Sequence, residues 1–166
     1  MTGRALVIGV GNPYRRDDGV GLVILDGLRA SGADRFDVIE SNGESSSLVE
    51  TWTGRSAVIV VDAVSSGALP GTVHRLECSL GRWDVSPGLV QMSSHGAGLA
   101  EAVVLGQVLG RFPSRLIFLG VEVLDVSAGE GLSIPVAATV PGIIAMIGVE
   151  VAEGPRSTEG GCGLGQ

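Results

Sequence analysis

Three continuous apolar runs limit the fold of this chain more than any other feature. They are ALVIGVG at residues 5–11, AVIVVDAV at residues 57–64 and LIFLGVEV at residues 116–123. Runs of this kind are typical of strands that are buried on both faces of a parallel sheet. Segments with helical spacing, such as residues 19–30, lie between them, and alternating strands and helices indicate an α/β fold.

Two further segments complete the predicted sheet. FDVIES at residues 36–41 is typical of a short strand, and TVHRLE at residues 72–77 alternates apolar and polar residues. Alternation indicates a strand with one face in water, which favours a sheet edge. We read His74, which lies on this strand, as a structural residue. We therefore expect a three-layer α/β fold. Its twisted, mostly parallel sheet has about five strands, with helices on both faces and one antiparallel edge strand.

Length and composition narrow the class of protein. The 166 residues suggest a single domain at residues 1–152, followed at 153–166 by a Gly-rich tail that we expect to be disordered. The net charge of −7 argues against a nucleic-acid partner, because phosphate contacts need clustered Lys and Arg. Two cysteines without zinc-type spacing suit a reducing compartment. We find no apolar stretch near the ~18 residues that span a membrane, so we expect a cytoplasmic protein without a membrane partner.

Three side chains that are distant in sequence are predicted to share one crevice. Asp18 follows the first strand and Asp62 ends the third, and doubly wound sheets bind ligands beyond the carboxyl ends of such strands. Two carboxylates there repel each other unless a cation or a proton lies between them. His95 opens a predicted helix, where the neutral imidazole that ligates metals is favoured. This mixed oxygen and nitrogen set suits zinc or nickel better than magnesium.

The residues alone leave other interpretations open. Asp17 or Asp18 can serve as a plain N-cap of the following helix, Asp62 can cap a turn, and His95 can be a surface cap. The opening GVGNPY also resembles a dinucleotide-binding turn, although Tyr14 stands where the third glycine is required. Glu40 lies where that fold places its ribose-binding acid. A non-catalytic nucleotide-binding module is therefore the alternative from another class.

Four motifs, taken in order, resemble those of the hydrogenase maturation proteases, and the likeness extends to about residue 150. They are GVGNPYRRDDGVG at residues 9–21, VIVVDAV at 58–64 with PGT at 70–72, SSHGAGLAEAV at 93–103, and GVEVLDVSAGEGLSIPV at 120–136. Members of this family are endopeptidases that trim the large subunit of nickel–iron hydrogenases. The resemblance implies that the partner of this chain is the precursor of such a subunit.

The resemblance also implies roles for individual residues. Asp18, Asp62 and His95 would ligate nickel that the precursor already carries, and zinc could occupy the same site. The two aspartates would also be the catalytic acids. A peptidase of the same fold with a different protein substrate is the remaining alternative.

A loop after the second predicted strand departs from the family pattern. Family members commonly carry Asp-Gly-Gly-Thr there, whereas this chain has ESNGESS at residues 40–46. Glu40 takes the place of the acid, and Gly43 is the glycine that remains. The resemblance implies that this loop helps to recognise the substrate. We therefore expect Glu40 and Gly43, together with Gly11 and Asn12 of the opening motif, to bind the precursor.

Overall fold

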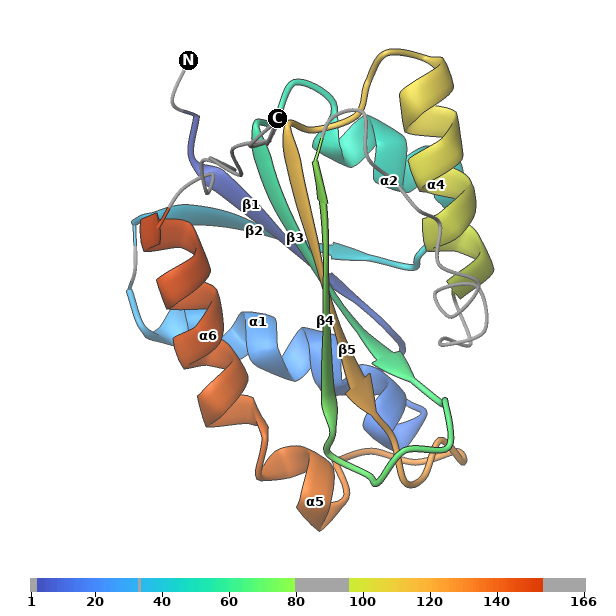
Figure 1. Cartoon of the computed structure of the whole chain (residues 1–166). Coiled ribbons are helices and arrows are strands. Elements are labelled where there is room, and N and C mark those ends of the chain that lie inside the picture. Colours follow the sequence, from blue (N-terminus) through green and yellow to red (C-terminus); the bar gives the residue numbers. More distant parts are fainter. Residues whose placement is uncertain (1–2, 33, 80–95, 154–166) are drawn as a thin grey trace, which may run out of the picture.

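The computed structural model describes residues 3–32, 34–79 and 96–153, and it has a five-stranded sheet at its centre (Figure 1). The strands run in the order β2-β1-β3-β5-β4. β4 is antiparallel to its neighbour β5 and lies at the edge, and the other neighbouring pairs are parallel. This confirms the predicted sheet. The strands are β1 (Ala5–Val10), β2 (Phe36–Ser41), β3 (Ala57–Val64), β4 (Val73–Ser79) and β5 (Arg115–Glu122).

Helices cover both faces of the sheet and give the expected three layers (Figure 1). α1 (Val20–Ala30) and α6 (Val140–Glu153) pack on one face, and α2 (Ser45–Trp52) and α4 (Gly96–Val108) pack together on the other. Each face has its own apolar core, because successive residues of a strand point to opposite sides. In β3, for example, Ile59 and Val61 join the core beneath α1 and α6, whereas Val58 and Val60 join the core beneath α2 and α4.

The order of the strands reverses between β1 and β3, and the sheet opens there. The ladder between these strands ends at the pair Gly9 and Val61, whereas β3 stays paired with β5 as far as Val64. β1 thus separates from β3 while each strand stays paired with its other neighbour. A crevice at such a reversal is where open α/β sheets bind ligands.

The first turn of α1 lies directly against this crevice because of Gly21. A Cβ atom on Gly21 would lie 2.6 Å from the carbonyl oxygen of Val10 and 2.7 Å from that of Val61. Any larger residue would push the helix away from both strands. Gly21 therefore permits the close contact between α1 and the sheet. In a dinucleotide-binding turn, the third glycine of the motif has this role.

The end of the chain differs in detail from the prediction. The apolar pattern of residues 135–152 predicts one last helix with a kink at Pro141, but the structure has a short α5 (Ile134–Ala137) followed by α6. The break precedes Pro141, which lies in the first turn of α6, where a missing N–H costs little. Glu153 closes α6. The rest of the predicted tail lies outside the described residues.

The same segment corrects the expectation that no stretch is apolar enough to span a membrane. Residues 134–153 are long and apolar enough by composition, with a mean hydropathy of 1.9. In the fold, however, Ile143 and Ile147 of α6 are buried in the core beneath the sheet. By contrast, Ile134 and Val149 are exposed, and only 22% of the apolar window is buried, so packing within the described residues uses part of this apolar surface.

Four charged residues close the end of the sheet where β3 and β5 begin. Arg115, the first residue of β5, donates to Glu77 at 2.7 Å and to Glu150 of α6 at 2.7 Å. Arg75 of β4 donates to the same two carboxylates, at 2.6 and 2.5 Å. Arg115 and Glu150 are buried, and buried charges are tolerated when they are paired and hydrogen-bonded in this way.

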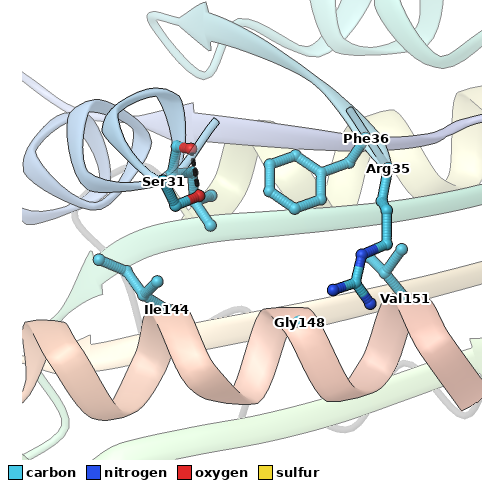
Figure 2. Close-up of a pocket in the computed structure, with 7 residues that line it drawn as sticks. Ser31, Arg35, Phe36, Ile144, Gly148 and Val151 are labelled. Atoms are coloured by element: carbon cyan, nitrogen blue, oxygen red, sulfur yellow. Dashed lines mark hydrogen bonds between the residues drawn. The ribbon is translucent and has the colours of Figure 1, made fainter. Parts of the chain in front are cut away.

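An apolar groove of about 220 Å³ lies between α1, the start of β2 and α6 (Figure 2). Figure 2 shows the side chain of Arg35 reaching over the groove toward α6. The groove lies beside Phe36, the first residue of β2, and therefore at the opposite end of the sheet from the crevice. Its lining residues are Leu28, Ser31, Arg35, Phe36, Ile144, Gly148 and Val151.

Candidate active site

Asp18 lies at the crevice, in a single 3-10 turn, η1 (Arg16–Gly19), that precedes α1. The side chain of Asp18 is fully buried, and η1 packs against β3. A Cβ on Gly11 would lie 2.0 Å from the carbonyl oxygen of Asp18, so only glycine fits between this turn and the end of β1. The alternative that Asp17 or Asp18 is the N-cap of α1 is wrong, because Gly19 occupies that position.

Asp62 lies on the neighbouring strand at the same end of the sheet. It does not end β3, as we expected, because the strand continues to Val64. It is buried, and its Oδ1 accepts a hydrogen bond from the backbone N–H of Ala63 at 2.8 Å. Because Val58, Val60 and Val64 face α2 and α4, strand alternation directs Asp62 to that same face.

His95 lies outside the described residues, so the predicted metal triad stays a prediction. α4 begins at Gly96, directly after it. The first turn of α4 packs against the loop after β2, since a Cβ on Gly98 would lie 2.1 Å from the carbonyl oxygen of Gly43. Within residues 3–32, 34–79 and 96–153, no group of three metal-ligating side chains comes together.

A surface groove of about 430 Å³, which we call the β1–β2 groove, runs beside the crevice. Two predicted substrate-binding residues line it, Gly11 and Glu40, and the Glu40 carboxylate lies 3.1 Å from Nη1 of Arg29. The sequence did not single out the rest of the lining, because a groove forms only when separate loops meet. The lining residues are Gly11, Pro13, Leu22, Glu40, Ser41, Asn42 and Ser47.

The other two predicted substrate-binding residues flank this groove and do not line it. Asn12 is exposed, and its Oδ1 accepts a hydrogen bond from the backbone N–H of Tyr14 at 2.9 Å, which shapes the loop after β1. Gly43 is buried with φ +81°, and its N–H donates to Ser41 Oγ at 3.1 Å. Both residues thus set the shape of loops beside the groove.

Sequence reasoning gave Asp17 no role beyond capping, yet four donors form hydrogen bonds to its carboxylate. Its Oδ2 accepts from the backbone N–H groups of Leu124 and Asp125, both at 2.9 Å. Ser133 donates to it twice, from the backbone N–H at 2.7 Å and from Oγ at 2.8 Å. Burial alone would raise the pKa of Asp17, but these donors outweigh burial and hold the pKa below its ordinary value.

Glu122 has a similar structural role on the other side of β3. This buried carboxylate accepts from the N–H of Ser66 at 2.7 Å, from Ser66 Oγ at 2.8 Å and from the N–H of Gly67 at 3.1 Å. His74 lies 3.1 Å away, which supports the structural role predicted for it. Burial opposes ionisation of Glu122, but the donors prevail and lower its pKa. The motif GVEVLDVSAGEGLSIPV at residues 120–136 therefore contains two residues that hold loops in place, Glu122 and Ser133.

Comparisons with known proteins agree with this architecture. The profile of the hydrogenase maturation protease family matches residues 28–150. The hydrogenase 2 maturation protease of Escherichia coli is 30% identical over 142 residues, which are 82% of this chain and 84% of that protein. The hydrogenase expression/formation protein HupD of Rhizobium leguminosarum bv. viciae is 29% identical over 147 residues, covering 85% of this chain and 70% of that protein.

A solved structure extends the similarity to the fold. The hydrogenase maturating endopeptidase HybD from Escherichia coli superposes with a TM-score of 0.77 at 26% identity, over 91% of this chain and 93% of that one. These similarities favour peptidase chemistry over the nucleotide-binding alternative. The chain belongs to the hydrogenase maturation protease family.

Proposed function

We propose that this protein is an endopeptidase that removes a C-terminal peptide from the nickel-loaded precursor of a nickel–iron hydrogenase large subunit. One observation carries the proposal most directly. Two buried carboxylates, Asp18 and Asp62, lie on contacting elements at the reversal point of the sheet, beside a groove. Family membership adds that this protein is a peptidase.

In this proposal the nickel arrives with the substrate and binds between Asp18, Asp62 and His95. Acidic side chains that converge in a crevice favour a cation there. The direction of Asp62, toward the face that α4 covers, supports the inclusion of His95, because α4 begins one residue after it. Oxygen and imidazole ligands together suit nickel, and they would also accept zinc.

The β1–β2 groove is the proposed path of the scissile peptide. Gly11 lines the groove with its backbone, and the place of its missing side chain is taken by the carbonyl oxygen of Asp18. Glu40 supplies a carboxylate at the groove and is held by Arg29, while Asn12 and Gly43 keep the flanking loops in shape. We place the reaction in the cytoplasm, where thiols such as that of buried Cys78 stay reduced.

Peptide hydrolysis at this site requires an activated water. The ion can lower the pKa of that water, or one of the two aspartates can accept its proton.

The direct test uses nickel-loaded large-subunit precursor and intact-mass spectrometry. Wild-type protein is expected to shorten the precursor by one C-terminal peptide, and Asp62→Asn or His95→Ala is expected to lower the rate at least ~100-fold. Asp26→Asn, which alters an exposed acid on α1, is the control and should keep the wild-type rate. An unchanged precursor mass would contradict the proposal.

Nickel-free precursor separates metal recognition from peptidase activity. If recognition depends on nickel, this precursor stays uncut. Cleavage of both forms at the same rate would overturn the role of nickel while leaving the endopeptidase function in place.

A further inference from the structure

We propose that Asp17 is a positioning residue: by clamping η1 to the loop between β5 and α5, it fixes Asp18 at the crevice. This inference rests on the proposed function for its meaning, but it begins with an independent observation. A fully buried carboxylate, next in sequence to a predicted catalytic residue, is bound to a segment more than a hundred residues away.

The clamp spans the whole loop, which we call the β5–α5 loop (residues 123–133). The Asp17 carboxylate binds the loop near its start, at the N–H groups of Leu124 and Asp125. It also binds the end of the loop, at the N–H and hydroxyl of Ser133. One side chain therefore holds both ends of the loop against η1.

Backbone contacts join the same two segments. The backbone N–H of Asp17 donates to the carbonyl oxygen of Asp125 at 3.0 Å. The backbone N–H of Arg16 donates to the carbonyl oxygen of Gly129 at 3.0 Å. In return, Gly129 donates to the carbonyl oxygen of Tyr14 at 2.9 Å. Arg16 has φ +47°, an unfavourable value for a side-chain-bearing residue. The carboxylate of Asp17 is well placed to hold the turn in this conformation.

Geometry links the clamp to Asp18. Successive side chains in a 3-10 turn diverge by about 120°, so when Asp17 points to the β5–α5 loop its neighbour points elsewhere. On its other side, η1 rests on Gly11, where no Cβ would fit against the Asp18 carbonyl. The turn is thus held from two sides, and the direction of the Asp18 side chain is fixed without Asp17 touching the substrate.

The first test compares the kinetics of three variants with wild type on nickel-loaded precursor. Asp17→Asn places an amide among four hydrogen-bond donors, and it should lower kcat about 10–100-fold with KM within about twofold, because the β1–β2 groove is untouched. Ser133→Ala removes one donor and should give a smaller decrease in kcat. Glu150→Gln, at the far end of the sheet, disturbs a buried carboxylate without contacting η1 and should keep kcat.

The second test does not require the proposed reaction. Amide hydrogen exchange should accelerate at Leu124, Asp125 and the η1 turn in Asp17→Asn, and calorimetry should show at least tenfold weaker Zn²⁺ binding than in wild type. Glu150→Gln should change neither. Faster exchange together with wild-type kcat and Zn²⁺ affinity would overturn the positioning role and leave Asp17 a structural residue.

Failure of the two hypotheses can be told apart. If wild-type protein leaves the precursor intact, the proposed function fails. Amide hydrogen exchange and Zn²⁺ binding still test the positioning role of Asp17 in that case. If Asp17→Asn does not fold, Ser133→Ala provides the same comparison. A wild-type kcat and Zn²⁺ affinity in that variant, despite a faster-exchanging β5–α5 loop, would count against the clamp.

Discussion

Two buried acidic residues at the crevice end of the sheet, Asp17 and Glu122, hold loops in place. Asp17 and Glu122 each accept hydrogen bonds from two neighbouring loop residues or more, including backbone N–H groups and a serine hydroxyl. Those donors occupy their carboxylate oxygens, so both residues hold loops. Asp18 and Asp62 are the acids proposed for chemistry because of their place at the reversal point of the sheet. Burial alone does not identify a catalytic acid, because Asp17 and Glu122 are buried as well.

Glu122 makes the stability of the protein dependent on pH. Its pKa is lower in the folded state than in the unfolded chain. Its contribution is therefore fully present above the unfolded pKa of about 4.3 and is lost as the pH falls through the folded value. We expect Glu122→Gln to reduce the free energy of unfolding by ~1–3 kcal/mol at pH 7.

Urea titrations of both proteins at pH 7 and at successively lower pH check this prediction. The difference between wild type and Glu122→Gln should shrink below about pH 4.3. A difference that stays constant with pH would show that the charge of Glu122 does not contribute.

The sequence identified candidate acids but not the partners that distinguish their roles. Asp18 and Asp62 follow from the ends of two predicted strands, because parallel strands bring their carboxyl ends to one edge. The role of Asp17 depends on Ser133, 116 residues away, and no local pattern reports such a contact. Gly43, which we predict to bind substrate, also contacts the start of α4 through its backbone carbonyl, and no local pattern reports that contact either.

At the scale of elements, the close contact of α1 with the sheet depends on Gly21, which has no side chain. We expect Gly21→Ala to destabilise the fold by about 2–4 kcal/mol, because the new methyl group would overlap two carbonyl oxygens of β1 and β3. Since α1 follows η1 directly, the variant should also weaken Zn²⁺ binding. Thermal denaturation and calorimetry measure the two effects.

Gly142 provides a matched control, since it also lies in the first turn of a helix. A Cβ there would meet nothing within 4 Å, so Gly142→Ala should be neutral or should stabilise the protein by up to about 1 kcal/mol. Equal destabilisation by the two substitutions would indicate that helix position, rather than contact with the strands, determines the effect.

Predicted elements match the structure best where the sheet dictates the pattern. Strands β1, β3 and β5 are buried on both faces, so continuous apolar runs locate them. The final helix was harder to delimit, because its apolar residues continue through the break between α5 and α6. For residues 45–54 the pattern predicts a helix opened by serine, whereas Glu44 is the N-cap of α2 and accepts hydrogen bonds from the N–H groups of Ser46 and Ser47.

For the whole molecule, the proposed metal site predicts a gain in thermal stability. A ligand that binds only the folded state stabilises it by about 2.7 kcal/mol at a hundred times its Kd. For a chain of this size, that corresponds to a rise in Tm of about 5–10 °C. We expect this rise when Zn²⁺ is added to wild type or Asp26→Asn. No rise is expected for Asp62→Asn, and an equal rise there would place the ion elsewhere.

The ion-paired cluster of Arg75, Glu77, Arg115 and Glu150 lies at the end of the sheet opposite to the crevice. The residues that anchor the edge strand and α6 are therefore separate from the loops that would meet a precursor. Substitutions that retune which precursor is accepted can accumulate in those loops without loosening the anchor. Partner choice and foldability are thus separable properties of this protein, and a library confined to residues 12–15, 40–42 and 44–47, which keeps Gly11 and Gly43, would be a sound starting point for redirecting it.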